Sequence, residues 1–178
     1  MSSYAVFLRG VNVGGITVKM ADLKDALKSR PFSAVTTLLA SGNVVLSSGL
    51  PAAGVKQEFE ECLRETFGYD AWVVVLAAEQ VAELVRACPY PPDDSSTHTY
   101  LTLGSDAGVL AELYDAGTAL GGTELTRLGP AALAWRAPTG GTLDSPFSKL
   151  CSKPRYKAST TTRNLRTMIK VRDAAALV

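Results

Sequence analysis

The sequence predicts an α+β protein in which two ferredoxin-like units of the β-α-β-β-α-β type form one compact molecule. Short runs of β-forming residues alternate with segments of helical periodicity, and a similar order of elements recurs in both halves of the chain. The 178 residues are enough to bury a sizeable core. Apolar residues make up 47% and charged residues 20%, which excludes a disordered, collagen-like or coiled-coil chain.

The first half contains every element of such a unit. Pro31 and Gly68 end the two predicted helices, and Ser41-Gly42-Asn43 is a turn between two strands. The order is a strand at 4–9, a helix at 20–29, strands at 35–40 and 44–47, a helix at 55–67 and a strand at 72–76.

The second half repeats most of this order after a helix at 81–88. The proline-rich link 89–96 is the best candidate boundary, which gives a first unit with its trailing helix at 1–90 and a second unit at 91–178. The predicted elements are a strand at 98–103, a helix at 109–114, a hairpin from 123–128 and 131–136, and a basic C-terminal helix at 161–171. No closing strand is evident, so the repeat is inferred from element order alone.

Composition also bears on location. No apolar run approaches the ~20 residues of a membrane helix. The three cysteines are odd in number and widely spread, so we expect free thiols and a cytoplasmic protein rather than a disulfide framework. Trp72 and Trp135 fall in predicted strands and are expected in the core.

The net charge of +1 hides a basic segment. Residues 149–172 hold eight basic residues and no acidic one. In the predicted final helix, Arg163, Arg166 and Lys170 share one face, and Ser159 to Thr162 supply hydroxyls for its N-terminus. A cation in the first turn opposes the helix dipole, and an anionic ligand would relieve that conflict. The alternative is a solvated basic face. If the ligand hypothesis holds, we expect Arg163→Glu to abolish binding and leave folding intact.

A glycine-rich segment, Arg9 to Gly15, joins the first strand to the first helix. Its glycines let a ligand approach the backbone closely, while Arg9, Asn12 and Lys19 add donors. It matches neither G-x-G-x-x-G nor the P-loop pattern, so a wide strand-to-helix loop is the alternative. The turn Ser41-Gly42-Asn43 is most simply a hairpin turn, and would line the same cleft only if it lies beside Arg9.

Other chemistry has little support in the sequence. His98 is the single histidine, no G-x-S-x-G motif is present, and no cluster has the spacing of metal ligands, so neither a metal nor a cofactor is expected. Asp93 and Asp94 are interpreted as solvated residues of the link. No nucleophile or general base stands out, so the sequence does not decide whether the protein is an enzyme.

Three segments together resemble one family. They are Val6-Phe-Leu-Arg-Gly-Val-Asn-Val-Gly-Gly15 with Lys19-Met20, Ser41-Gly-Asn-Val-Val45, and Thr161-Thr-Arg-Asn-Leu-Arg-Thr167, to which Ser148-Lys-Leu150 adds. With their spacing, they resemble the bacterial family called domain of unknown function 1697 over essentially the whole chain. Leu165 stands where family members often have Trp. The resemblance implies a cytoplasmic protein of two related α+β units and leaves its activity open.

The function hypothesis that these observations favour is binding of a phosphate-bearing ligand, either a nucleotide or a nucleic-acid backbone. A small-molecule enzyme acting on an anionic substrate, and a structural or assembly protein using its basic surface, are the alternatives. The residues expected to form one shared positive pocket are Arg9, Gly10, Asn12, Gly14, Gly15, Lys19, Ser41, Asn43, Thr162, Arg163, Asn164, Arg166 and Lys170.

Overall fold

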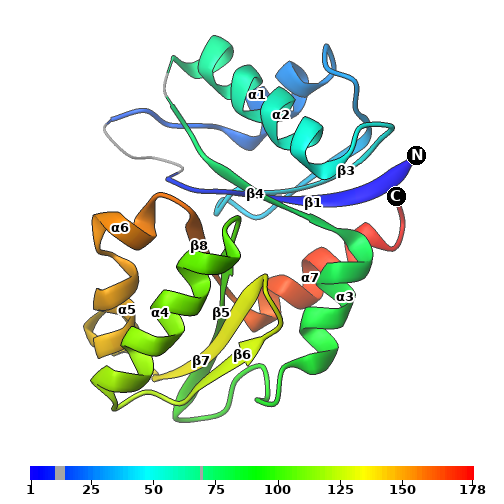
Figure 1. Ribbon diagram of the computed structural model, residues 1–178. Coiled ribbons are helices and arrows are strands. Elements are labelled where there is room, and N and C mark those ends of the chain that lie inside the picture. The colour runs from blue at the N-terminus through cyan, green and yellow to red at the C-terminus, as the bar shows by residue number, and fades with distance from the viewer. Residues whose placement is uncertain (11–14, 69) are drawn as a thin grey trace. The chain divides into compact units, whose positions relative to one another are not determined.

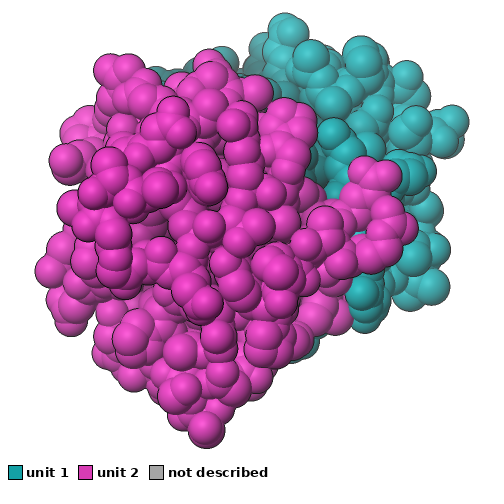
Figure 2. Space-filling model, turned by 60° about the horizontal axis from the view of Figure 1, so that its bottom comes forward, with its two compact units in different colours: residues 1–82, 170–178 teal, residues 83–169 magenta. Residues whose placement is uncertain are grey.

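The computed structural model describes residues 1–10, 15–68 and 70–178. They divide into two compact units, residues 1–82 with 170–178 and residues 83–169, which Figure 2 colours separately. The divisions fall inside two helices, α3 (Ala78–Ala87) and α7 (Leu165–Ala175). That residues 1–90 and 91–178 form the two domains stays a prediction.

The first unit is a four-stranded antiparallel sheet with two helices on one face, as the sequence predicts (Figure 1). Its strand order is β2-β3-β1-β4, so the first strand is central. The elements before α3 are β1 (Ser2–Leu8), α1 (Met20–Leu27), β2 (Ser33–Leu38), β3 (Asn43–Ser48), α2 (Ala52–Phe67) and β4 (Val73–Ala77). Gly68 ends α2 in the left-handed conformation that glycine favours.

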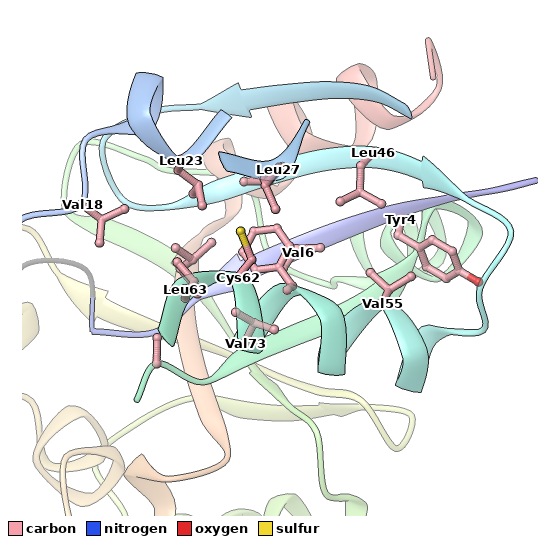
Figure 3. Packing of buried hydrophobic residues seen from close by; sticks show 14 residues of the cluster. Tyr4, Val6, Val18, Leu23, Leu27, Leu46, Val55, Cys62, Leu63 and Val73 are labelled. Carbon is pink, nitrogen blue, oxygen red and sulfur yellow. The ribbon is translucent and has the colours of Figure 1, made fainter. Parts of the chain in front are cut away.

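The core of the first unit lies between this sheet and its helices (Figure 3). Because side chains alternate along a strand, Val6 and its neighbours two residues away all point toward the helices. They meet Leu23 and Leu27 of α1 and Leu63 of α2, all fully buried. Each such side chain contributes about 1.5–3 kcal/mol through burial. Helical spacing in the sequence thus identified the buried faces of both helices correctly.

The second unit repeats the first, strand for strand. Its sheet has the order β6-β7-β5-β8, again fully antiparallel with the first strand central. The repeated ferredoxin-like architecture is therefore confirmed. The elements are β5 (Thr97–Gly104), α4 (Ala107–Leu120), β6 (Leu125–Leu128), β7 (Ala132–Pro138), the 3-10 helix η1 (Thr142–Asp144), α5 (Pro146–Cys151), α6 (Pro154–Lys157) and β8 (Thr160–Asn164), followed by α7.

The prediction of one helix over 161–171 is wrong. Thr160–Asn164 forms the edge strand β8, paired with β5, and the helix begins only at Leu165. Three consecutive threonines explain the strand, because β-branched side chains are restricted in helices and pack well on a pleated surface. The closing strand that the second half seemed to lack is therefore present. The apolar face predicted for the helix is otherwise right, since Leu165 and Met168 are buried.

The helices α5 and α6 were not predicted, although α5 has a recognisable start. Ser145 is its N-cap and accepts a hydrogen bond from the Ser148 amide at 3.2 Å. Pro146 occupies the first helical position, where a missing N–H costs nothing. A second proline, Pro154, starts α6 in the same way. The proline positions were the available signal for both.

Helix α4 is capped at its N-terminus and packs closely on the core near its C-terminus. At its N-terminus the Asp106 carboxylate accepts hydrogen bonds from the amides of Gly108 and Val109, at 2.8 and 3.1 Å. Near its C-terminus Gly117 lies against Phe147, whose ring packs edge-on against Trp135 at a centroid distance of 5.3 Å. A side chain at Gly117 would meet the Phe147 ring at 2.6 Å. The glycine is needed for close packing.

We expect Gly117→Ala to lower the free energy of unfolding by about 1–3 kcal/mol, because the added methyl overpacks the core against Phe147. An alanine in an unobstructed helix interior would instead stabilise by up to ~1 kcal/mol. Urea unfolding measures the difference. Gly49→Ala is the control, since a Cβ there meets nothing within 4 Å. A stabilised Gly117→Ala variant would contradict the described packing.

Candidate functional site

One end of the first sheet brings two of the predicted segments together. The Leu8 amide donates to the Gly42 carbonyl at 2.8 Å, and the Arg9 amide donates to the Trp72 carbonyl at 3.0 Å. The chain leaving β1 at Arg9 therefore runs between the β2–β3 turn and the start of β4. The condition set by the sequence, that the Ser41-Gly42-Asn43 turn lie beside Arg9, is met.

Asn43 has a structural task in this turn. Its side chain is fully buried, and Nδ2 donates to the Leu38 carbonyl at 2.9 Å and to Ser41 Oγ at 3.0 Å. Both amide hydrogens are used in this way, so the Asn43 side chain has no further donor to offer a ligand. Its contribution to a site is to hold the turn in place.

Arg9 is the half-buried cation at this end of the sheet. Burial lowers the pKa of its guanidinium below the ordinary value, because a charged group loses hydration in a less polar environment. Among residues 1–10, 15–68 and 70–178, no carboxylate forms an ion pair with it. A cation held in this way gains from an anionic partner.

Trp72, which the sequence placed in the core, is 48% exposed and lies one residue before β4. The register Leu8↔Val73 continues into the Arg9–Trp72 hydrogen bond, so the two residues are neighbours across the strand pair. The prediction failed because side chains alternate along extended chain: Ala71 and Val73 on either side of Trp72 are buried in the core, and Trp72 points away from it. An exposed indole beside a cation is a surface on which a flat ring can stack.

Helix α1 begins at the same end of the sheet, with Lys19 at its N-cap. Its first helical hydrogen bond runs from the Leu23 amide to the Lys19 carbonyl at 3.0 Å. A lysine side chain cannot accept a hydrogen bond, so it leaves the first amides of the helix uncapped. It also places a cation at the positive end of the dipole.

An open groove of about 550 Å³ lies beside Lys19. It is lined by Thr17, Val18, Lys19, Met20, Thr37, Leu39 and Ala40. Leu39 has a φ of 60°, a conformation that non-glycine residues seldom adopt, and its side chain is exposed. Strain of this kind often marks a ligand site. The sequence contained no signal for the conformation of Leu39.

The remaining residues of the glycine segment fit a loop. Gly10 and Gly15 have φ values of 70° and 80°, which explains why glycine occupies both positions. Asn12 and Gly14 lie outside the described residues.

The second group of predicted residues lies on β8 and α7. Thr162 Oγ1 lies 2.9 Å from Thr102 Oγ1, which also accepts a hydrogen bond from the Trp135 indole at 3.0 Å. Thr162 therefore belongs to a hydrogen-bonded chain that crosses the second sheet. Lys170 is exposed on α7. A pocket shared with the Arg9 segment stays a prediction.

Arg163 is not the solvated cation of a first helical turn, which corrects the sequence interpretation. It lies in β8 and is only 8% exposed. Its Nη1 donates to Thr161 Oγ1 at 2.7 Å and to the Thr162 carbonyl at 3.0 Å. Burial lowers its pKa to about 10, so the guanidinium remains charged at neutral pH.

Asp93 is the centre of a polar cluster, not a solvated residue of the link. Its carboxylate is 3% exposed and lies 2.9 Å from His98 Nδ1 and 2.6 Å from Arg166 Nε. Asn164 Nδ2 donates to it at 3.3 Å, while Asn164 Oδ1 accepts from the Arg166 amide at 2.8 Å and so caps α7. The charge of Arg166 is thus matched by a carboxylate far away in sequence.

Burial alone would raise the pKa of the Asp93 carboxyl. Contacts with His98, Asn164 and Arg166 outweigh that effect and hold the pKa below its ordinary value. A lowered carboxyl pKa means that the ionised form stabilises the folded state.

Within residues 1–10, 15–68 and 70–178 no group of three or more His, Cys, Asp and Glu side chains is placed to hold a metal ion. Within the same ranges no helix is both long and apolar enough to cross a bilayer.

We expect Asp93→Asn to lower the free energy of unfolding at pH 7 by about 2 kcal/mol, because charge-assisted hydrogen bonds are lost. Since the folded pKa of Asp93 lies below the unfolded value, its contribution is present above about pH 4 and disappears as pH falls further. Urea unfolding of variant and wild type at pH 7 and pH 3 measures this. The exposed Asp115→Asn variant is the control, and an equal Asp93 effect at both pH values would contradict the cluster.

We expect Arg163→Glu to destabilise the protein by about 3 kcal/mol or more, since it buries a carboxylate in place of a hydrogen-bonded guanidinium. The variant therefore cannot serve as the clean binding test that the sequence suggested. Lys157→Glu, at an exposed position of α6, should change stability by less than ~0.5 kcal/mol. Thermal melts of the two variants give the comparison, and similar melting temperatures would show that Arg163 is not buried.

Comparison with known proteins agrees with this architecture. The conserved bacterial protein SP0830 of Streptococcus pneumoniae has a similar structure, with a TM-score of 0.80 at 19% identity over 98% of both chains, a likeness that concerns the fold alone. An unknown protein of Galdieria sulphuraria aligns over 99% of this chain and 90% of its own at 13% identity, with a TM-score of only 0.26. No curated protein matches the sequence. A family model described as "Protein of unknown function (DUF1697)" matches residues 1–130, and the chain therefore belongs to this family.

Proposed function

We propose that the protein binds a phosphate-bearing ligand at the end of the first sheet where β1 ends and α1 begins. The observation that carries this proposal is Lys19 at the N-cap of α1, beside an open groove. A helix N-terminus without a side-chain acceptor leaves its amide hydrogens available to bind an anion. The Lys19 ammonium adds positive charge beside them.

The energetic argument concerns the free protein. A cation at a helix N-terminus costs about 0.3–1 kcal/mol through the dipole, and the uncapped amides are left to water. A phosphate oxygen would accept from those amides and pair with Lys19, so the same two features become favourable in the complex. The hydroxyls of Thr17 and Thr37 line the groove and supply further donors.

Arg9 and Trp72 extend the proposal toward a nucleotide. Arg9 lies at the same sheet end and brings a second cation, half-buried and without a carboxylate partner among the residues described. Its neighbour Trp72 presents an exposed indole, on which a base stacks with about 1–3 kcal/mol. By contrast, Val44 to Leu46 of β3 are buried aliphatic side chains, so β3 lacks the aromatic platform of RNA-recognition sheets.

We expect Lys19→Gln to weaken binding of ATP and of inorganic pyrophosphate five- to tenfold, because one charge-assisted contact to phosphate is lost. Asp22→Asn should strengthen both two- to fivefold, since Asp22 is the carboxylate in the first turn of α1. Calorimetric titration at fixed low salt gives the affinities.

The matched control is Lys24→Gln, which removes the same charge from the last turn of the same helix. Equal losses in Lys19→Gln and Lys24→Gln would mean that only the net charge matters, and the site would be wrong. Trp72 supplies a second readout: ATP should quench its fluorescence and pyrophosphate should not. The buried Trp135 provides the background signal, which Trp72→Phe isolates.

A further inference from the structure

The second unit carries a groove of its own, separate from the residues of the proposed phosphate site. It has a volume of about 560 Å³, within the range of small-ligand sites, and lies between the C-terminal end of α4 and the start of α5 and α6. Helix α4 contributes Ala116 and Leu120 to its lining, and α5 contributes Pro146, Lys149 and Leu150, with Asp144 just before α5 and Lys153 just after it.

The apolar part is unusually open to water. Leu120, the last residue of α4, is 55% exposed, and Leu143 of η1, next to the lining residue Asp144, is exposed even more. Leu150, in contrast, is buried and packs with the core of this unit. Leu150 therefore forms a well-packed floor of the groove, whereas Leu120 forms an apolar wall that is open to solvent. An apolar ligand would bury this wall, which favours binding.

The two lysines of the lining supply positive charge to a ligand in the groove. Lys149 lies on α5 and Lys153 is the N-cap of α6, and both side chains line the groove. Lys149 approaches Asp144 at 3.9 Å, but both side chains are largely exposed and such a pair is weak. Lys153 forms no ion pair with any residue in the described ranges. Of the two further cations in residues 149–157, Arg155 pairs with Glu112 and Lys157 lies outside the lining, so the charge available to the groove is that of Lys149 and Lys153.

We propose that this groove binds a single-chain amphiphilic anion: an acyl or alkyl chain on the wall of Leu120 and Pro146, with its carboxylate or phosphate head between Lys149 and Lys153. An apolar wall alone would suit many partners, but the lining carries two lysines against one carboxylate, Asp144, and this net positive charge favours an anionic head. The groove belongs wholly to residues 83–169, so the proposal is independent of the phosphate site at α1.

The test uses decanoate, decyl phosphate and decanol, each below the concentration at which it aggregates. We expect saturable binding of both anions by the wild-type protein in calorimetry, and at least tenfold weaker binding of neutral decanol. Decanoate and decyl phosphate share the chain, so their ratio shows which head the groove prefers. Decanol binding as tight as decanoate, or no saturable binding of either anion, would overturn the proposal.

Variants separate the two halves of the groove. Lys149→Gln with Lys153→Gln should weaken decanoate about tenfold and leave decanol unchanged, whereas Leu120→Ser should weaken decanoate and decanol alike. Lys157→Gln, which removes an exposed charge of α6 outside the lining, is the matched control and should leave decanoate binding within twofold. Because Leu120 and both lysines are exposed, the variants should have the same melting temperature as the wild-type protein. Equal losses from the Lys157 and Lys149–Lys153 variants would show that the head does not lie in the groove.

Discussion

The structure depends on antiparallel pairing of the first strand of each unit with both its neighbours. In the first sheet β1 lies between β3 and β4, so the chain that leaves β1 emerges between the β2–β3 turn and the start of β4. This is why Arg9 is adjacent to Gly42 and Trp72, which are distant from it in sequence. The candidate site is thus a product of strand order, and no single motif could have specified it.

Much of the fold could be predicted because local and global signals agree in the first unit. Helical spacing, the Ser41-Gly42-Asn43 turn and Gly68 all point to the same elements, and the buried leucines of α1 and α2 confirm them. The failure at residues 161–164 has a specific cause. The helix prediction gave more weight to charges at helical spacing than to the three threonines. These β-branched residues favour a strand, and pairing with β5 stabilises it.

The electrostatics were harder to predict because pairing partners come from distant elements. The basic segment contains no acid in sequence, yet Arg166 meets Asp93 and Arg155 meets Glu112. A count along the chain therefore overstates the free positive charge of this segment. Trp72 shows the same limit for burial, since its exposure depends on which side of the chain it faces, opposite to the buried Ala71 and Val73, and not on its own hydrophobicity.

Because the two units share one topology, α1 and α4 are structural counterparts: each follows the first strand of its sheet. The start of α4 is occupied by the carboxylate of Asp106, an anion that belongs to the chain itself. The start of α1 has a lysine where its counterpart has that aspartate. The positive start of α4 is thus neutralised by a carboxylate of the chain itself, whereas at the start of α1 the proposed phosphate ligand would supply that negative charge from outside.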